Sequence, residues 1–506
     1  MNRASWWRAA LVIVVGGLAT RVLWLAWQYY FAGGPRYRVE SAVIAFVIAG
    51  AMAIALRAAD RPAADTPDAG VPRVWLPVFI VAAVALYHRA IGLGFLSDDY
   101  TLRAMAQSDG LGSGSGWFFR PVPLLLWRGL LAAGDSPAAL HLLNIVLHGT
   151  NAFLVAVLGA AMGTRRDVAL GAAALFLTFP ALPEAVVWAA GIQDVLMTTT
   201  ALAAVVLCAR TPGVGTGALV CGSLILGFGT KETAVCIPVL IAICWMTRER
   251  LRRDVAIYAA IAVVTAVYLA IRLQMGIASD YLAAPTRYFV KQMIVIAFGT
   301  LAAPWRAPAS PLERWLAFAA AGFVVVLLVH ACLTWRRSDH RLQRDIRLAL
   351  WVLASIAPVF TLFFVGPLLE GSRYLYLASC AWALVLADLI ASMSERVEKR
   401  TVVFAASMAV VGVIFAASVQ REIGVWQQAA DLRDRVLADA RAALERDRCV
   451  QPVFISVPDS VAGAYVFRNG FPEALGLRSG SEPGSGPAPG SDCTFTWTAD
   501  RFARSR

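Results

Sequence analysis

The stretch VWLPVFIVAAVALYHRAIGLGFLSDDY, residues 74–100, joins an apolar run that is long enough to cross a bilayer to an acidic pair. Runs of about 20 apolar residues are typical of membrane-spanning helices. Asp98 and Asp99 follow the run directly, where a charged side chain is costly and usually has a function. Adjacent carboxylates also raise one another's pKa, which suits proton transfer. The alternative is a Ser97-Asp98 helix cap at the membrane surface.

The rest of the chain repeats the apolar pattern. Of 506 residues, 59% are hydrophobic, and the mean hydropathy is +0.65, whereas a soluble domain is nearer 45–50% apolar. The net charge of +12 is assigned to arginines in cytoplasmic loops, because aromatic residues do not interleave with the basic ones as a nucleic-acid surface requires. The sequence therefore predicts an all-α polytopic membrane protein with the lipid bilayer, and no nucleic acid, as partner.

Thirteen apolar segments are predicted to cross the membrane. They are residues 7–31, 38–57, 74–95, 138–162, 167–183, 192–210, 214–229, 232–247, 254–274, 314–334, 347–367, 374–393 and 401–418. The first is too long, and lacks the small-residue cleavage site, for a signal peptide. A further segment, 289–303, is short and predicts an interfacial or re-entrant helix, although a crossing is left open.

Arginine clusters orient these spans. With the N-terminus in the cytoplasm and 289–303 not crossing, every cluster falls inside, as the positive-inside bias requires. The clusters are Arg165-Arg166, Arg248/Arg250/Arg252/Arg253, Arg336/Arg337/Arg341/Arg344/Arg347 and Arg396/Lys399/Arg400. The protein is then expected in the inner or plasma membrane of the cell, with its C-terminus outside the cytoplasm.

The same reading divides the chain into three parts. Residues 1–73 hold two N-terminal transmembrane helices and a cytoplasmic linker, and residues 74–418 form the transmembrane core with a first outer loop over 96–137. Residues 419–506 form a small extracytoplasmic α+β region, in which the Gly/Ser/Pro-rich stretch 479–491 is expected to be flexible.

Polar residues gather at the predicted outer surface. His141, Asn144 and His148 share one helix face, which either lines a cavity or supplies hydrogen bonds between helices. Their spacing is poor for a two-histidine metal site. Glu184 and Asp194 flank a short turn after two prolines, and Asp194 could simply cap the next helix.

Two cations lie at the same predicted outer surface. Lys231 precedes Glu232 in a break between apolar runs, which is either a plain hairpin or a phosphate-binding helix start. Arg373 opens the twelfth span beside Tyr374, which suits bidentate phosphate binding or an interfacial anchor belt. Together these groups are a plausible constellation for attack by a hydroxyl on a lipid-linked phosphate ester.

Several short stretches follow one another in a family's order. They are FLSDDY (95–100), FRP (119–121), HLLN (141–144) with His148, PEAVVW (183–188) with Asp194, KETA (231–234) and RYLY (373–376). This set resembles the GT-C membrane glycosyltransferases, specifically the protein O-mannosyltransferase-like group and its transmembrane-and-tetratricopeptide relatives. The chain differs in having Phe179-Pro180-Ala181-Leu182 where relatives often have His-Pro-x-His, and no tetratricopeptide repeats follow.

The resemblance implies a GT-C-like fold and a hexosyl- or pentosyltransferase, with an inverting reaction expected. Its donor would be a polyprenyl-phosphate-linked sugar, with chemistry on the extracytoplasmic side and a glycan, lipid or protein as acceptor. The first-loop acid that serves as catalytic base would be Asp98 or Asp99, and the donor phosphate would meet Arg373, Lys231 and Tyr374. The remaining matched residues would bind substrate or support the site: Arg120, His141, Asn144, His148, Glu184, Asp194 and Glu232.

Other functions remain open on the sequence. A lipid-linked sugar transporter or flippase would need polar residues near the middle of the bilayer, whereas most charges here lie at span ends. A glycan polymerase or ligase would also use lipid-linked donors. No cofactor is certain; Asp98, Asp99 and Glu184 could hold a divalent cation, although the relatives by motif need none. The identities of the sugar and the acceptor are not encoded in any motif.

The C-terminal region has a different character. Residues 426–447 predict a charged amphipathic helix with Leu432, Val436, Ala440 and Leu444 on one face. Residues 452–457 and 493–497 read as strands. Because this region is small and its predicted compartment is oxidising, we expect a Cys449–Cys493 disulfide, with two unpaired thiols as the alternative.

The orientation can be tested with a reporter. An alkaline phosphatase domain fused after Arg337 should remain inactive, because the arginine cluster around it is predicted to lie in the cytoplasm. A fusion within 96–137 is the matched control and should be active. Phosphatase activity of the Arg337 fusion would overturn the orientation.

Overall fold

The computed structural model describes residues 70–108, 119–134, 136–210, 213–275, 296–306, 339–359, 364–395, 398–447, 449, 452–477, 493–498 and 501–505. Several expectations fall outside these ranges. They are the spans 7–31, 38–57 and 314–334, most of the linker before residue 74, and the flexible stretch 479–491. Segment 289–303 is described only from residue 296, where residues 296–302 are helical.

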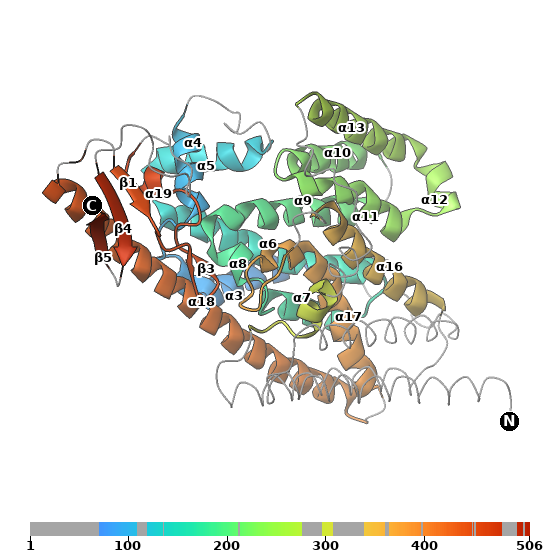
Figure 1. Ribbon diagram of the computed structural model, residues 1–506. Helices are drawn as coiled ribbons and strands as arrows, with labels where there is room; N and C mark the ends of the chain where they lie inside the picture. Colours follow the sequence, from blue (N-terminus) through green and yellow to red (C-terminus); the bar gives the residue numbers. More distant parts are fainter. Residues whose placement is uncertain are drawn as a thin grey trace.

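The described residues form mainly helices packed around an extended apolar core (Figure 1). The longer helices are α3 (Trp75–Tyr87), α6 (Pro137–Ala161), α7 (Arg166–Leu177), α9 (Ile192–Cys208), α10 (Val214–Phe228), α11 (Cys236–Trp245), α13 (Val255–Gln274), α16 (Asp339–Ile356), α17 (Tyr376–Ser394) and α18 (Arg400–Asp447). The shorter ones are α4 (Asp98–Gln107), α5 (Pro121–Gly134), α8 (Pro183–Val187), α12 (Arg248–Arg253) and α19 (Phe471–Ala474). Single 3₁₀ turns are η1 (His88–Ala90), η2 (Ala189–Gly191), η3 (Glu232–Val235), η5 (Ala357–Val359) and η6 (Ser372–Leu375).

Five helical segments within the described ranges are long and apolar enough to cross a membrane. They are Pro137–Ala161, Ala189–Cys208, Val255–Gln274, Ser372–Ser394 and the apolar part of Arg400–Asp447. Helix α17 is buried along nearly its whole length and forms the centre of the bundle. Helix α13 is equally apolar but exposes Val263 and Leu273 by 62% and 70%. An apolar helix with an uncovered apolar side suits a lipid environment.

Other predicted spans are shorter than expected. The span 74–95 is helical only to Tyr87, because η1 and a turn through Gly94 bring the chain back toward the bundle. The span 232–247 loses its first turn to η3, so α11 has only 10 residues. The span 347–367 is shifted, since α16 begins at Asp339 and ends at Ile356. The described residues therefore confirm a largely helical protein with apolar helices. They do not confirm the predicted count of thirteen membrane spans.

Helix α18 corrects the expectation of two separate elements. A span over 401–418 and a helix over 426–447 were expected, but one helix of 48 residues covers both. Residues 419–447 contain no proline, and Gly424 is their single glycine. No helix-breaking residue therefore ends the helix where the polarity changes. At 1.5 Å per residue the helix is about 72 Å long, more than twice the hydrocarbon thickness of a bilayer. Figure 1 shows α18 running beside the bundle to the small sheet.

The C-terminal region has the expected α+β character. Strands β1 (Pro452–Ile455), β4 (Cys493–Thr498) and β5 (Arg501–Ser505) form a sheet in the order β1-β4-β5. β1 and β4 are parallel, whereas β4 and β5 are antiparallel. Strands β2 (Ser460–Val461) and β3 (Ala464–Tyr465) form a separate hairpin, which the sequence did not predict. Phe454 packs against Phe495 and Phe502, with ring centroids 5.3 and 4.9 Å apart, and these rings supply much of the small core.

The predicted disulfide between Cys449 and Cys493 is present in the structure. It ties the chain just beyond α18 to the first residue of β4, across a sequence separation of 44. The free cysteines Cys236, Cys244 and Cys380 are buried in apolar helices as small core residues, whereas Cys208 and Cys221 are only partly buried.

Loss of this bridge should loosen the C-terminal region. Cross-linking a loop of this length stabilises a fold by about 4 kcal/mol in the chain-entropy account. The Cys449→Ala, Cys493→Ala double variant should therefore expose the region to limited proteolysis while the helical core resists, with Cys221→Ala as the control. A peptide map of oxidised protein should contain the linked pair. Two free thiols in that map would contradict the bridge.

Candidate functional site

The segment from Pro183 to Asp194 is the centre of the polar site. Pro183 lies at the first position of α8, where its missing N–H costs nothing, and the chain then turns through η2 into α9. A Cβ on Gly191 would lie 2.1 Å from the Ala185 carbonyl oxygen, so only glycine allows this close turn. The segment is buried almost throughout. Its side chains and backbone contact most of the residues that the sequence singled out.

Glu184 is held by the twelfth predicted span. Its carboxylate forms an ion pair with the Arg373 guanidinium and accepts hydrogen bonds from the Ser372 hydroxyl at 3.2 Å and the Arg373 backbone N–H at 3.3 Å. The Glu184 side chain is 5% exposed and that of Arg373 is 19% exposed. A buried carboxylate needs such a partner, because a lone charge is costly in an apolar interior. The loop of Glu184 contains no cation, and Arg373, 189 residues later in the chain, supplies one.

Three aromatic rings surround Arg373. The centroids of Tyr374, Trp188 and Tyr465 lie 5.0, 5.2 and 5.7 Å from its guanidinium carbon. The Tyr465 hydroxyl also lies 3.3 Å from Nη1, the nitrogen that binds Glu184. Burial raises the pKa of Tyr465, and so does the Glu184 charge. Among the described residues none accepts a hydrogen bond from Nη2 of Arg373, which leaves one edge of the guanidinium for an anion.

Two further ion pairs continue from this one. Lys231 pairs with Asp194 in a nearly closed environment, with side chains 6% and 8% exposed. Arg120 binds Glu232 through Nε at 2.9 Å and Nη2 at 2.8 Å, and it also donates to Gln193. Burial lowers the pKa of Lys231, and the positive charges of Arg120 and Arg373 lower it further, whereas Asp194 raises it.

This row of three pairs changes the expected roles of two residues. Lys231 is committed to Asp194, so it is a poor candidate for direct contact with a donor phosphate. Asp194 does not merely cap α9, because its carboxylate is the counterion of that lysine. Arg373 is the cation that keeps an accessible edge.

The acidic doublet occupies the start of α4, and its two members differ. Asp99 is fully buried, and its carboxylate accepts from the Leu96 N–H at 2.9 Å and the Ala190 N–H at 2.7 Å. Burial raises the pKa of Asp99 well above its usual value, although both N–H donors lower it. Asp99 thus fastens the first outer loop to the turn after α8.

Asp98 faces outward. It is partly exposed, and its Oδ1 accepts a hydrogen bond from the Asn469 side-chain amide at 2.6 Å. The Ser97 hydroxyl lies 3.4 Å from the same oxygen. Within the described part of the chain, Oδ2 of Asp98 has no partner. Of the two carboxylates that the sequence could not separate, only Asp98 is placed to meet a substrate.

The polar face of α6 forms hydrogen bonds that hold neighbouring segments together. His141, Asn144 and His148 are all fully buried. His141 lies between the carbonyl oxygens of Val187 and Gly94, at 2.9 and 3.0 Å, and Asn144 donates to the Trp188 carbonyl at 2.9 Å.

His148 lies between the Tyr376 hydroxyl at 2.7 Å and the Leu177 carbonyl at 3.0 Å. The face that could have lined a cavity instead binds the central segment and α17.

The geometry does not favour the divalent cation considered from the sequence. Among the described residues, no group of three His, Cys, Asp or Glu side chains is close enough to hold a metal. Asp99 is occupied by backbone N–H groups, and Glu184 is paired with Arg373. The proposed set of Asp98, Asp99 and Glu184 is therefore wrong as a metal site.

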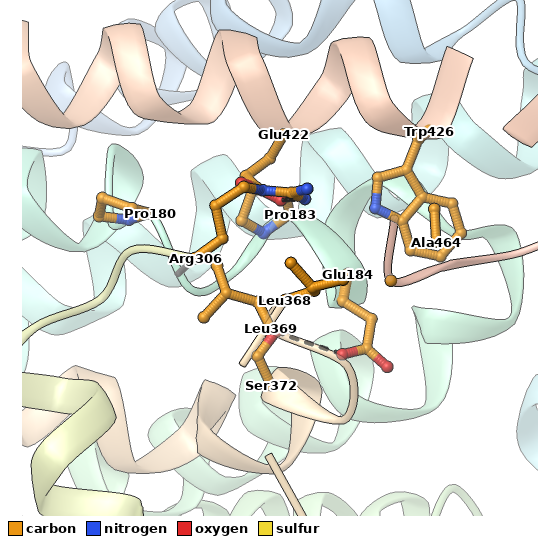
Figure 2. Close-up of a pocket in the computed structure, with 11 residues that line it drawn as sticks. Pro180, Pro183, Glu184, Arg306, Leu368, Leu369, Ser372, Glu422, Trp426 and Ala464 are labelled. Carbon is orange, nitrogen blue, oxygen red and sulfur yellow. Dashed lines mark hydrogen bonds and ion pairs between the residues drawn. The ribbon is translucent and has the colours of Figure 1, made fainter. Parts of the chain in front are cut away.

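A small pocket opens beside Glu184 (Figure 2). Its cavity volume is about 10 Å³, which is room for about one water molecule. The lining includes Glu184, Ser372, Arg306, Glu422 and the Trp426 ring, with Glu422 and Trp426 reaching in from α18. Asp98 and Asp99 are not part of this lining. Asp99 binds the same segment through the Ala190 N–H, and nearby the Trp188 indole donates to the Leu96 carbonyl at 3.0 Å.

Several site residues had no signal in the sequence. Arg306 and Glu422 form a buried ion pair, with Nε to Oε1 at 2.6 Å, that joins the chain before residue 307 to α18. Arg433, also on α18, donates to the carbonyl oxygens of Leu93 and Phe95 at 2.6 and 2.8 Å. An arginine within a charged amphipathic helix reads as solvated, so only the folded structure reveals that it fixes the loop before Asp98.

The row of ion pairs yields a stability prediction. Lys231→Met leaves Asp194 buried without a counterion and should cost about 3–5 kcal/mol, while removing both charges in Lys231→Met, Asp194→Leu should recover much of that loss. Arg165→Ala breaks an exposed pair with Asp167 and should cost at most about 1 kcal/mol. Thermal denaturation in detergent compares the three. Equal effects of Lys231→Met and Arg165→Ala would refute a buried pair.

Comparison of the chain with models of known protein families and with curated proteins finds no match. The case for a function depends on three local arrangements. These are the accessible Asp98 carboxylate, the aromatic enclosure of Arg373, and the buried segment that Asp99 and Arg373 both contact.

Proposed function

We propose that this protein is an integral membrane glycosyltransferase that moves a sugar from a polyprenyl-phosphate-linked donor to a hydroxyl acceptor. One observation carries the proposal: the acidic doublet and Arg373 are anchored to the same short segment, the doublet through its buried member Asp99. Asp99 and Arg373 bind that segment through Ala190 and Glu184, which are six residues apart in sequence. The donor and the acceptor could therefore be held on neighbouring groups.

In this mechanism Asp98 is the general base. Its open Oδ2 takes the proton from the acceptor hydroxyl, and the resulting oxygen attacks the anomeric carbon. The bond between that carbon and the phosphate oxygen breaks, and the polyprenyl phosphate departs with the electron pair. Attack opposite the leaving group inverts the anomeric configuration. Removal of a general base typically costs 10²–10⁴-fold in rate.

Arg373 stabilises the departing phosphate. Nη1 is fixed by Glu184 and Tyr465, so the guanidinium plane is held before any substrate binds. Charge stabilisation by a preorganised donor is worth more than by a mobile one, because no reorganisation is needed during the reaction. The three rings around Arg373 limit access of water and could contact the sugar or the first isoprene units.

The remaining polar residues support these two groups. Arg120, Gln193 and Glu232 brace the start of α9, next to the Lys231–Asp194 pair. His141, Asn144 and His148 hold the central segment against α6 and α17.

The apolar helices suit a lipid-linked donor. They could place the site at the membrane surface, with the C-terminal region outside the cytoplasm, where the disulfide would persist. The charges of the site are paired with one another, whereas a transporter needs polar groups arranged around broken helices at mid-bilayer.

The doublet can be separated by mutation. Asp98→Asn should lower sugar transfer from radiolabelled polyprenyl-phosphate sugar by about 10²–10⁴-fold, with the thermal midpoint unchanged, because a side chain at the surface is altered. Asp99→Asn should instead lower stability by about 1–3 kcal/mol, since its amide nitrogen faces a backbone N–H. Asp167→Asn, at an exposed site, is the control.

The same assay decides between enzyme and transporter. Formation of labelled glycosylated product that is lost in Asp98→Asn supports transfer. Movement of the intact lipid-linked sugar across vesicles without product, or full transfer activity of Asp98→Asn, would reject the mechanism.

A further inference from the structure

A segment of the C-terminal region lies directly on the residues before and at Asp98. The Val466 carbonyl accepts from the Ser97 N–H at 2.9 Å, and the Asn469 N–H donates to the Ser97 hydroxyl at 3.3 Å. The Asn469 side-chain amide then donates to Oδ1 of Asp98 at 2.6 Å. Phe467 stacks on Tyr100 with ring centroids 6.1 Å apart. Residues 466–469 therefore contact three residues at the start of α4: its N-cap Ser97, Asp98 and Tyr100.

The backbone at Ser97 is unusual. Ser97 has φ 49° and ψ −119° and is fully buried, in a conformation that non-glycine residues rarely adopt. Such strain costs on the order of 1–3 kcal/mol and persists only when surrounding contacts enforce it. The enforcing contacts here come from segment 466–469, whose partners lie about 370 residues away in the chain.

Gly470 explains how the two segments approach. It has φ +81°, and a Cβ at this position would lie 2.6 Å from the Ser97 carbonyl oxygen. No other residue could occupy this position without moving one segment from the other. The close approach is thus built into the backbone on both sides of the contact.

We infer that Asn469 is a positioning residue for Asp98, so that the C-terminal region completes the site. The inference rests on the proposed function. Asn469 occupies Oδ1 and fixes the rotation of the carboxylate, which leaves Oδ2 directed to the acceptor. The preceding hairpin places Tyr465 on Arg373. A single segment therefore orients both the base and the phosphate-binding arginine.

This role distinguishes Asn469 from an ordinary surface residue. Its side chain is exposed, so it contributes little to core packing, and its truncation should leave the fold intact. Its effect should appear in the chemical step. A carboxylate that rotates freely is displaced from the attacking oxygen, and a misplacement of about 1 Å can cost on the order of 100-fold in rate.

The test combines kinetics with a chemical probe of the Asp98 carboxylate. Asn469→Ala should lower kcat about 10- to 100-fold with little change in KM for the lipid donor, and Asn469→Gln, which keeps an amide donor, should recover part of the loss. Carbodiimide coupling with an amine, followed by peptide mass spectrometry, should label Asp98 several times faster in Asn469→Ala than in the unaltered protein. Ser460→Ala, in the hairpin that precedes Asn469 and without a side-chain hydrogen bond among the described residues, is the matched control.

The two readouts separate failure of the inference from failure of the function. If Asp98→Asn abolishes transfer but Asn469→Ala matches Ser460→Ala in kcat, Asn469 does not position the base, whatever the labelling. Unchanged labelling of Asp98 in Asn469→Ala also overturns the inference. If the unaltered protein transfers no sugar from several lipid-linked donors, the proposed function fails, and with it the catalytic meaning of Asn469, even where the labelling confirms the contact.

Discussion

The ion pair between Glu184 and Arg373 is the interaction on which the rest of the site depends. The Glu184 carboxylate, with 5% exposure, cannot remain charged there without a partner, and its own loop contains no cation. Pairing with Arg373 forces α8 against the start of α17. The turn after α8 then presents Trp188 to Arg373 and the Ala190 N–H to Asp99. Electrostatics in an apolar setting thus brings together parts of the chain that are far apart in sequence.

Much of the architecture could be predicted from local pattern. Apolar runs marked most of the helices, short stretches rich in β-branched and aromatic residues marked β1 and β4, and two cysteines in a polar region marked the disulfide. The continuity of α18 between the predicted span 401–418 and the predicted helix 426–447 was missed, because a change in polarity does not end a helix when no proline or cap interrupts it. Strand β5 and the β2–β3 hairpin are short, and their pairing depends on long-range contacts rather than on their own sequence.

The site was predictable in its residue types and less so in its pairings. Glu184, Asp194, Lys231 and Arg373 were all singled out, yet which acid meets which base depends on how four helices pack. The two members of the doublet look equivalent in sequence, but helix phase turns Asp99 into the interior and leaves Asp98 outside. Asn469 and Arg433 carry no local signal, because their importance comes entirely from the loop that they hold.

The length of α18 has a mechanical consequence. A continuous helix bends little, so α18 behaves as a rod whose apolar half is mostly exposed and whose polar half packs on the site loops and the small sheet. For a rod of about 72 Å, each degree of tilt displaces the far end by about 1 Å. Trp426 and Arg433 are carried on this rod: Trp426 stacks on Trp188, and Arg433 holds the loop before Asp98. A small tilt of the exposed apolar half would therefore be amplified along the helix into a shift of both side chains.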